Sequence, residues 1–497
     1  MNITLLLETV AAMHPERVAV HADGRDIRYP EMVVRCRRWG TWLRERARGA
    51  PVLYVGQHGK AFVELLFGSG YAGSPLVPVN YRVKPDEMSY FARSVSPGFA
   101  MVEHRYRYLL DAPTHEGKAL GVGAPEAEPP EGTVEAPFES DAAAVALFTS
   151  GTTSRPKPTW LSHGNLTAYV LNTVPAGSAA AHETTLVAVP PYHVAGVAAV
   201  LSNVFRGRRL VIMPQFAPRR WLELVRSEGV THALVVPTML SRILDELEQS
   251  PDLIPMTLTS LAYGGSKASE SLVNRALRML PSSVGLVNAF GLTETSSTVT
   301  LLGPEDHRTA FDSDDPAARA RLASAGRPVP GVEVRVVSED GEPLGPGEEG
   351  ELWVRGAQVA AAGENDLASV DDQGWLHTKD LAYFDEAGYL FILARTDDVI
   401  IRGGENITPQ EIQRVLEAHP AVLDAAIVGV PDEEWGHIVG ALVVGDRSAS
   451  EADLEAWVRA RLAGFKVPEV IVWCEELPYN DMGKVVRSRA VELLARR

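Results

Sequence analysis

The stretch "FTSGTTSRPKPTWLSHGN", residues 148–165, is the most unusual part of the sequence. It surrounds Gly151 with small hydroxyl residues, which are Thr149, Ser150, Thr152, Thr153 and Ser154. Backbone N–H groups around a glycine, together with hydroxyls and the ammonium of Lys157, form a donor surface suited to phosphate. The Walker phosphate loop does not fit, because Pro156 and Pro158 stand where its second glycine and its Ser/Thr belong. Taken alone, an ordinary Ser/Thr/Gly turn is the alternative.

Composition bounds the kind of protein. The 497-residue chain is too long for one compact core, which indicates two or more domains. Its net charge of −17 gives no electrostatic footprint for nucleic acid, so a site for an anionic ligand must create its own positive field. Only 8 of the 47 basic residues are lysines, which makes a lysine in a polar loop noteworthy.

Cysteine content and hydropathy indicate where in the cell the protein is expected to work. Cys36 and Cys474 are far apart in sequence and form no disulfide framework, and no Cys/His cluster has zinc spacing. The N-terminus lacks the basic region of a signal peptide, and no stretch approaches 18 uninterrupted apolar residues. The sequence therefore predicts a cytoplasmic protein without a membrane span.

Periodicity changes twice along the chain. Up to about residue 325, helix-like and strand-like segments alternate, which predicts layered α/β subdomains with parallel sheets. Residues 326–356 read as short strands separated by Gly, Pro and Asp turns, and hence as a β-rich segment. After Arg395 a small α+β unit follows. We expect a large N-terminal domain over residues 1–396 and a small C-terminal domain over 397–497.

A second unusual stretch is "NAFGLTETSS", residues 288–297. Phe290 could stack on a planar ring, Thr293 could donate to a phosphate oxygen, and Glu294 could hold Mg²⁺. A strand end with a core phenylalanine and a surface glutamate is the plainer interpretation. In "GWLHTKDLAYF", Asp380 could accept from ribose hydroxyls with help from Arg395, although ordinary hairpins would look the same.

The remaining stretch, "LPYNDMGKVVRSR", places Lys484 between a turn and a helix. The plainer interpretation is a solvated lysine at a helix start. Together and in this order, the stretches resemble the adenylate-forming superfamily of acyl- and aryl-CoA synthetases, peptide-synthetase adenylation domains and luciferases. Its motifs match "FTSGTTSRPKP", "PPYHVAG", "NAFGLTE", "GELWVRG", "GWLHTKD", "ARTDDVIIRGGENI" and "LPYNDMGKVVR", and they cover essentially the whole chain.

The resemblance implies that ATP and a carboxylic acid form an acyl-adenylate with release of pyrophosphate. The phosphate loop, Thr149 to Thr153 with Lys157, would hold the β- and γ-phosphates, Thr293 the α-phosphate and Glu294 Mg²⁺. Asp380 and Arg395 would bind ribose, and Lys484 would bridge the carboxylate and the α-phosphate. The adenine segment would comprise Gly264, Gly265, Ser266, Asn288, Ala289, Phe290 and Gly291. The β-rich segment would form a distorted barrel.

The resemblance also implies a thiol-transfer step. The small domain would rotate at the hinge residue Asp397 and bring Gly403 and Gly404 to the thiol tunnel, with Lys466 as a weaker candidate for a CoA phosphate. A solvated lysine is the equal alternative for Lys466. His193 would flank the acyl pocket, whose other expected residues are Ala195, Gly196, Val197, Val236, Gly265 and Ala289. These small residues could equally serve helix packing.

Several departures from the family pattern stand out. Ser154 and Pro158 occupy usual glycine positions of the phosphate loop, and Lys379 replaces the usual glycine before Asp380. "AAAGENDLASVDDQGW" is shorter than usual and gives no room for the insertion of ligases that stop at the acyl-adenylate, which favours CoA transfer. Phe290 replaces the commoner tyrosine and keeps a stacking surface.

The acid and its acceptor remain the open choices. The segment "PPYHVAGVAAVL" carries no carboxylate to pair with an α-ammonium, which argues against an α-amino acid and favours an aryl or a short- to medium-chain acid. The main expectation is a carboxylate–CoA ligase using ATP, Mg²⁺ and CoA. A stand-alone enzyme that loads a carrier-protein phosphopantetheine is the alternative, and a non-catalytic acyl- or adenylate-binding module is a remote one. The sequence leaves a homodimer open.

Overall fold

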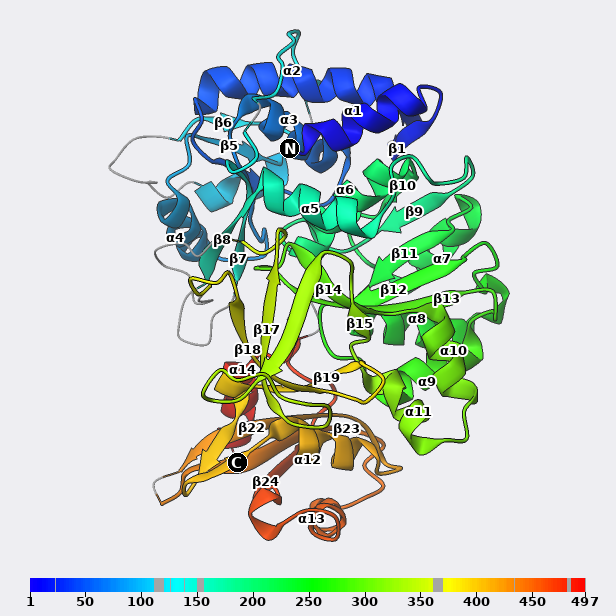
Figure 1. Cartoon of the computed structure of the whole chain (residues 1–497), viewed down its shortest axis with the longest axis vertical. Coiled ribbons are helices and arrows are strands. Elements are labelled where there is room, and N and C mark those ends of the chain that lie inside the picture. The colour runs from blue at the N-terminus through cyan, green and yellow to red at the C-terminus, as the bar shows by residue number, and fades with distance from the viewer. Residues whose placement is uncertain are drawn as a thin grey trace. The chain divides into compact units, whose positions relative to one another are not determined.

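The structure is a computed structural model (Figure 1). It describes residues 1–22, 24–110, 120–125, 127–137, 139–149, 156–360, 370–432, 434–480 and 484–496, and only the backbone at residues 397 and 406. These residues form two compact units. The first comprises Met1–Val334 and Val354–Leu376, and the second comprises Arg335–Trp353 and His377–Arg497.

A nine-stranded sheet of the first unit has the order β15-β14-β13-β12-β11-β9-β10-β1-β2. Its interior strands are parallel, and β2, β14 and β15 pair antiparallel at the two edges. Figure 1 shows β9, β11, β12 and β13 running side by side. The strands are β1 (Val18–Ala22), β2 (Arg25–Arg28), β9 (Thr184–Val187), β10 (Arg209–Ile212), β11 (His232–Val235), β12 (Ser260–Gly264), β13 (Gly285–Leu292), β14 (Ser297–Leu302) and β15 (Arg327–Pro328).

A six-stranded sheet of the same unit has the order β6-β5-β3-β4-β7-β8. It is parallel except for the last pair, in which β8 runs antiparallel to β7. All four residues of β3 and of β5 are buried, as expected for parallel strands covered on both faces. The strands are β3 (Val52–Val55), β4 (Leu76–Pro78), β5 (Phe99–Val102), β6 (Val122–Gly123), β7 (Ala143–Thr149) and β8 (Lys157–Ser162).

Helices follow most strands of these sheets. Proline in the first turn begins α2, α4, α7 and α8, where its missing N–H is not needed. The α-helices are α1 (Thr4–Met13), α2 (Tyr29–Ala47), α3 (Lys60–Ala72), α4 (Pro85–Val95), α5 (His163–Thr173), α6 (Val194–Arg206), α7 (Pro218–Ser227), α8 (Pro237–Gln249), α9 (Glu270–Met279), α10 (Pro304–Asp312) and α11 (Pro316–Ala320). Short 3₁₀ turns are η1 (His104–Leu110), η2 (Pro251–Leu253) and η3 (Arg321–Ala323).

The second unit begins with parts of a four-stranded sheet of order β16-β17-β18-β19. Its strands are β16 (Val332–Val337), β17 (Gly350–Gly356), β18 (Leu376–Phe384) and β19 (Leu390–Arg395). A 3₁₀ turn η4 (Thr396–Asp398), the hairpin β20 (Ile400–Arg402) and β21 (Glu405–Ile407), and a sheet of order β22-β23-β24 follow. The remaining elements are β22 (Val422–Asp432), β23 (Gly436–Gly445), β24 (Val470–Trp473), α12 (Pro409–Glu417), α13 (Glu451–Arg459), η5 (Gly464–Lys466) and α14 (Arg487–Ala495).

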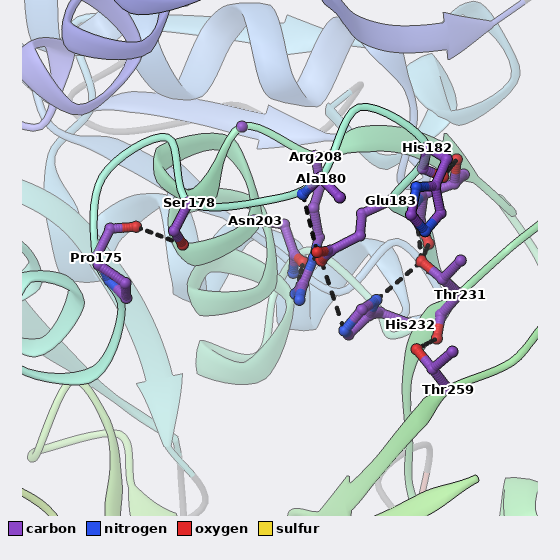
Figure 2. A network of polar contacts seen from close by, with 12 residues as sticks. Pro175, Ser178, Ala180, His182, Glu183, Asn203, Arg208, Thr231, His232 and Thr259 are labelled. Atoms are coloured by element: carbon purple, nitrogen blue, oxygen red, sulfur yellow. Dashed lines mark hydrogen bonds and ion pairs between the residues drawn. The ribbon is translucent and has the colours of Figure 1, made fainter. Parts of the chain in front are cut away.

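A network of polar side chains connects the amino ends of β9, β10 and β11 (Figure 2). Arg208 Nε donates to Glu183 Oε2 at 2.8 Å and Arg208 Nη1 to Asn203 Oδ1 at 2.9 Å. His232 Nε2 lies 3.7 Å from the same Glu183 oxygen, and its Nδ1 lies 2.9 Å from Thr231 Oγ1. Burial, reinforced by the Arg208 charge, lowers the pKa of His232 to about 4. The amino ends of these strands are thus held together by hydrogen bonds and ion pairs, whereas Gly265, Ser266 and Thr293 follow the carboxyl ends of β12 and β13.

The expected fold class is confirmed: a mixed α/β chain with a large N-terminal part of several sheets and a smaller α+β C-terminal part. The domain boundary between residues 396 and 397 stays a prediction, because a grouping of residues by packing does not locate a hinge. Within the residues described above, no helix combines the length and the apolar character that a bilayer span requires.

Candidate active site

The predicted phosphate loop joins two paired strands. Thr149, the last residue of β7, lies opposite Lys157, the first residue of β8. Lys157 is half-buried, and the preceding Pro156 accepts a hydrogen bond from Tyr90 Oη at 3.0 Å. Pro158 is tolerated because β8 is an edge strand, where a missing N–H costs little. Ser150, Gly151, Thr152, Thr153 and Ser154 lie outside the described residues.

The adenine segment lies on β12 and β13, at their carboxyl ends. Gly264 pairs with Ala289, and a Cβ on Gly264 would lie 2.2 Å from the Ala289 carbonyl oxygen. Gly265 has a φ of +85°, which glycine adopts without strain. Ser266 Oγ is buried and has no hydrogen-bond partner among the described residues. A donor without a partner at the end of a parallel strand is the type of group that a ligand satisfies.

The rest of this segment surrounds a tight turn. Asn288 Nδ2 donates to the Ser324 carbonyl at 3.0 Å, and Phe290 is half-buried. A Cβ on Gly291 would lie 1.7 Å from the Ser297 carbonyl oxygen, so only glycine fits there. Thr293 and Glu294 follow and are half-buried. Their side chains therefore sit on a turn whose backbone leaves little conformational freedom.

Gln358 holds this turn, and sequence reasoning missed it. The side chain is completely buried, and its Nε2 donates to the carbonyl oxygens of Thr295 at 2.9 Å and Thr298 at 2.8 Å. Ser296 Oγ donates back to the Gln358 carbonyl at 2.8 Å. The position "RGAQVA" follows the β motif in the sequence, but no periodicity or spacing indicates these contacts.

The acyl-pocket residues lie around the start of α6 and α8. His193 is the N-cap of α6, and its ring centroid lies 4.7 Å from that of Tyr192. A Cβ on Gly196 would lie 2.2 Å from the Pro190 carbonyl oxygen, which supports the packing interpretation at that position. Ala195 is half-buried, Ala289 is half-buried on β13, and Val197 and Val236 are 0% and 2% exposed.

A second histidine, absent from the sequence predictions, lies beside this helix start. His58 is 2% exposed, and its ring centroid lies 4.9 Å from that of Phe62. Burial lowers the pKa of His58 to about 4, and the backbone of Gly196 partly offsets that shift. The imidazole is therefore neutral at neutral pH.

The predicted ribose residues face each other across β18 and β19. Asp380 and Arg395 are paired in the ladder, and Arg395 Nε lies 3.6 Å from Asp380 Oδ1. Arg395 Nη2 also donates to the Thr378 carbonyl at 3.3 Å. Asp380 is 4% exposed. Lys379 has a φ of +60°, which explains why glycine is usual at this position: the backbone is left-handed there.

The hinge and CoA residues belong to the second unit. Asp397 lies in η4, and its side chain is outside the described part of the chain. Gly403 and Gly404 form the turn of the β20–β21 hairpin with φ of +56° and +90°. A Cβ on Gly403 would lie 2.7 Å from the Trp435 ring. Lys466 is bound to Glu411 with an Nζ–Oε2 distance of 2.5 Å, so a CoA phosphate would compete with that ion pair.

Lys484 is exposed, and its backbone is hydrogen-bonded to Asn480. Its N–H donates to Asn480 Oδ1 at 3.0 Å, and its carbonyl accepts from Asn480 N–H at 2.8 Å. Tyr479 and Val485 pair beside these residues. Tyr479 Oη donates to Asp424 Oδ2 on β22 at 2.7 Å, and burial raises the pKa of the Asp424 carboxyl. The half-buried Tyr479 side chain thus holds the segment next to Lys484 against the sheet.

These residues fit a nucleotide and a magnesium ion. Mg²⁺ bound to substrate phosphates needs only one or two carboxylates, and Glu294 supplies one on a rigid turn. Gly265 has a left-handed backbone beside the end of β12, and the buried Ser266 Oγ next to it is an unsatisfied donor. Lys157 supplies a cation at the start of β8, opposite Thr149. The nucleotide residues of the second unit, Asp380 and Arg395, form a separate pair of complementary hydrogen-bonding groups.

Comparison with known proteins identifies the family. The model of the AMP-binding enzyme family matches residues 7–362, and that of the AMP-binding enzyme C-terminal domain matches residues 411–484. A feruloyl-CoA synthase of Amycolatopsis sp is 34% identical over 500 residues, covering 96% of each chain. A fatty acid–[acyl-carrier-protein] ligase of Streptomyces coeruleorubidus is 32% identical over 517 residues, covering 98% of this chain and 96% of the relative.

A solved structure gives the same result. The o-succinylbenzoate CoA synthetase of Bacillus subtilis, in complex with its acyl-adenylate intermediate, has a TM-score of 0.83 and 26% identity over 97% of both chains. Structures of that synthetase with ATP and a magnesium ion match with a TM-score of 0.81 and 26% identity over 98% of both chains. The chain therefore belongs to the AMP-binding enzyme family, the adenylate-forming superfamily to which its seven motifs point.

Proposed function

We propose that the protein is an ATP-dependent, AMP-forming carboxylate–CoA ligase. The observation that supports this assignment is that β8, which follows the predicted phosphate loop, is connected by hydrogen bonds to the Thr293–Glu294 turn. Asn165 of α5, which follows β8, donates to the carbonyl oxygens of Ala357 and Val359, and Gln358 between them binds the turn. Lys157 at the start of β8 and the Thr293–Glu294 turn, which are expected to contact different phosphates of one ATP, thus belong to one hydrogen-bonded part of the chain.

The first step joins two anions. A carboxylate oxygen of the acid attacks the α-phosphorus of ATP, the bond between the α-phosphorus and the bridging oxygen breaks, and pyrophosphate leaves. Cations and oriented donors offset the charge repulsion of this step. Lys157 and the phosphate loop would hold the leaving pyrophosphate, and Thr293 the α-phosphate. Lys484 would contact both reacting oxygens as a compact point charge.

Magnesium would supply charge neutralisation at the phosphates when bound. Glu294 would hold it, and the Gln358-bound turn would orient that carboxylate. Asp380 would accept from the ribose hydroxyls with Arg395 beside it, which orients the nucleotide. Gly264, Gly265, Ser266 and the β13 residues would surround adenine. None of these roles requires a side chain to change its protonation state.

The second step moves the acyl group to a thiol. The sulfur of CoA attacks the acyl carbonyl, AMP leaves with the electron pair of the C–O bond, and the thiol proton passes to solvent. Gly403 and Gly404 would face the thiol in this step after rotation at Asp397. For Lys466, release from Glu411 would have to precede contact with a CoA phosphate.

The substrate is an aryl or a short- to medium-chain acid rather than an α-amino acid. The segment from Pro190 to Leu201 carries no carboxylate that could pair with an ammonium. The feruloyl-CoA and o-succinylbenzoate relatives act on aryl acids, which favours the aryl class. Two free cysteines, Cys36 and Cys474, fit a reducing compartment, for which we infer the cytoplasm.

Loading of a carrier protein is a second candidate. It is supported by the 32% identity to a fatty acid–[acyl-carrier-protein] ligase. CoA and a carrier-protein phosphopantetheine present the same thiol, so the two functions differ only in the acceptor. A homodimer is compatible with either and is decided by sedimentation rather than by activity.

A mixed reaction analysed by mass spectrometry tests the proposal. Purified protein receives ATP, Mg²⁺, CoA and a panel of aryl and of short-, medium- and long-chain acids. One dominant CoA thioester, formed with AMP and pyrophosphate, is the expected result. Acyl-AMP without thioester would favour the carrier-protein acceptor. Absence of both products from every acid would contradict the proposal, and the same panel with Lys484→Ala serves as the background control.

A further inference from the structure

The contacts of Gln358 lie between two parts of the nucleotide site. On one side, its amide N–H groups and its own carbonyl make three hydrogen bonds to Thr295, Ser296 and Thr298, all between 2.8 and 2.9 Å. Nearby, Ala360 N–H donates to the Glu294 carbonyl at 2.8 Å. Residues 358–360 therefore bind the backbone of the turn that carries Glu294.

On the other side, the same segment is bound to the helix that follows the phosphate-loop hairpin. Asn165 Nδ2 donates to the carbonyl oxygens of Ala357 at 3.0 Å and Val359 at 2.8 Å. Asn165 is itself fixed by a capping box with Ser162, the last residue of β8. A continuous set of hydrogen bonds thus links β8, which begins at Lys157, to the turn.

The turn needs such external support. Ser296 and Ser297 have φ of +55° and +132°, conformations that non-glycine residues rarely adopt. Strained backbone of this kind persists only where the surrounding structure fixes it, and it concentrates at functional sites. Thr295 Oγ1 bonds the Leu292 and Ser297 carbonyls within the turn, and Gln358 supplies the bonds from outside.

We propose that Gln358 is a positioning residue of the adenylation step. It holds the Thr293–Ser296 turn in the shape that presents Glu294 to Mg²⁺ and Thr293 to the α-phosphate, and it couples that turn to the phosphate-loop hairpin. This inference rests on the proposed function. Gln358 contacts no reacting atom in this role and acts through the backbone of the turn.

Chemistry favours glutamine over its isosteres here. The two carbonyl acceptors of Thr295 and Thr298 require a group with two N–H donors, which an amide provides. Methionine has a similar length and volume but no donor, so Gln358→Met leaves two buried carbonyls unsatisfied. Gln358→Glu would place a carboxylate oxygen against those carbonyls and is the harsher change. Ser296→Ala removes one bond of the set without altering the core volume.

The test measures metal-dependent nucleotide binding, because this binding would not change if Gln358 served only the stability of the fold. ATP binding is titrated with and without Mn²⁺, and bound Mn²⁺ is followed by electron paramagnetic resonance. For Gln358→Met we expect metal-dependent ATP affinity to fall about 10-fold or more, because two buried acceptors lose their donors and the turn relaxes. Metal-free ATP binding and transfer from pre-made acyl-adenylate to CoA should fall less than metal-dependent binding, because they depend on the turn through Thr293 alone.

Ser296→Ala covers the case in which Gln358→Met does not fold, with an expected loss of about 3- to 10-fold in the same metal-dependent affinity. Gln373→Met, at an exposed position of the same unit, is the matched control and should behave as wild type. Wild-type metal dependence in a folded Gln358→Met or in Ser296→Ala, with only a lower melting temperature, would overturn the proposal. The binding readout needs no turnover, so wild-type protein that makes no thioester refutes the function and leaves this test standing.

Discussion

Replacing Tyr479 with phenylalanine tests whether the hydrogen bond between Tyr479 and Asp424 positions the segment that carries Lys484. The change removes one oxygen atom, which donates to Asp424 Oδ2 at 2.7 Å, and keeps the ring. After the change, the Ala425 N–H, 2.9 Å from Oδ1, is the hydrogen-bond donor that the structure gives to the Asp424 carboxyl. A hydrogen bond to a charged group is worth about 1.5–3 kcal/mol, and tenfold in rate corresponds to about 1.4 kcal/mol.

The expected loss follows from this magnitude. If the whole energy of this hydrogen bond serves to position Lys484 for adenylation, its loss slows adenylation by about 10- to 100-fold. Burial raises the pKa of the Asp424 carboxyl and so favours its neutral form, to which a hydrogen bond is weaker, and this places the effect toward the lower end of that range. Transfer from acyl-adenylate to CoA does not use Lys484 and should keep its rate.

Measuring the two half-reactions separately tests whether Tyr479 positions Lys484 for adenylation. Pyrophosphate release in a single turnover reports adenylation, and thioester formation from purified acyl-adenylate reports transfer. Tyr108→Phe is the matched control, because Tyr108 is 54% exposed. Wild-type pyrophosphate release in a folded Tyr479→Phe protein would refute the anchoring role. Equal loss of both half-reactions would show that the small domain is generally damaged.

Three further predictions concern catalysis, pH and backbone strain. Lys484→Ala should slow pyrophosphate release by about 100-fold or more while sparing transfer from acyl-adenylate, and equal loss of both refutes its role. Folding lowers the pKa of His58 from about 6.5 to about 4. Between these pH values the unfolded chain binds more protons than the folded one. The free energy of unfolding therefore falls as pH drops from 6.5 to 4, by up to about 1.4 kcal/mol per pH unit. Melting temperatures of His58→Leu should therefore depend less on pH in that window, and an unchanged dependence would contradict this. Lys379→Gly should raise the melting temperature, because a left-handed lysine costs about 1–2 kcal/mol and glycine's entropy offsets about 0.5–1 of it, and a lower melting temperature would show that the Lys379 side chain contributes more than the strain costs.

Local patterns predicted much of the fold. The alternation of strands and helices before residue 326 becomes two mostly parallel sheets, and the strand expected to end at the phosphate loop is β7, which ends at Thr149. Buried parallel strands leave continuous apolar runs in the sequence, and the loops after them carry the motifs. The notable glycines also have a visible cause, since Gly264 and Gly291 sit where a Cβ would meet backbone atoms.

The supporting contacts could not be predicted. Gln358 and Thr295 are 63 residues apart, and Tyr479 and Asp424 are 55 apart, so neither pair follows a helical or strand period. The residues around His58, in "VGQHGK", are typical of a polar loop and do not distinguish it from a surface histidine. For Gly196 the sequence left pocket lining and helix packing equally open, and the nearby Pro190 carbonyl in the structure favours packing.

The most direct test of the central claim follows one oxygen atom. A substrate acid identified by the panel is labelled with ¹⁸O in its carboxylate and is converted with ATP, Mg²⁺ and CoA. Attack of the carboxylate on the α-phosphorus transfers one labelled oxygen to AMP, and we predict AMP that carries a single ¹⁸O together with unlabelled pyrophosphate. Label in inorganic phosphate with formation of ADP, or AMP without label, would contradict an acyl-adenylate route.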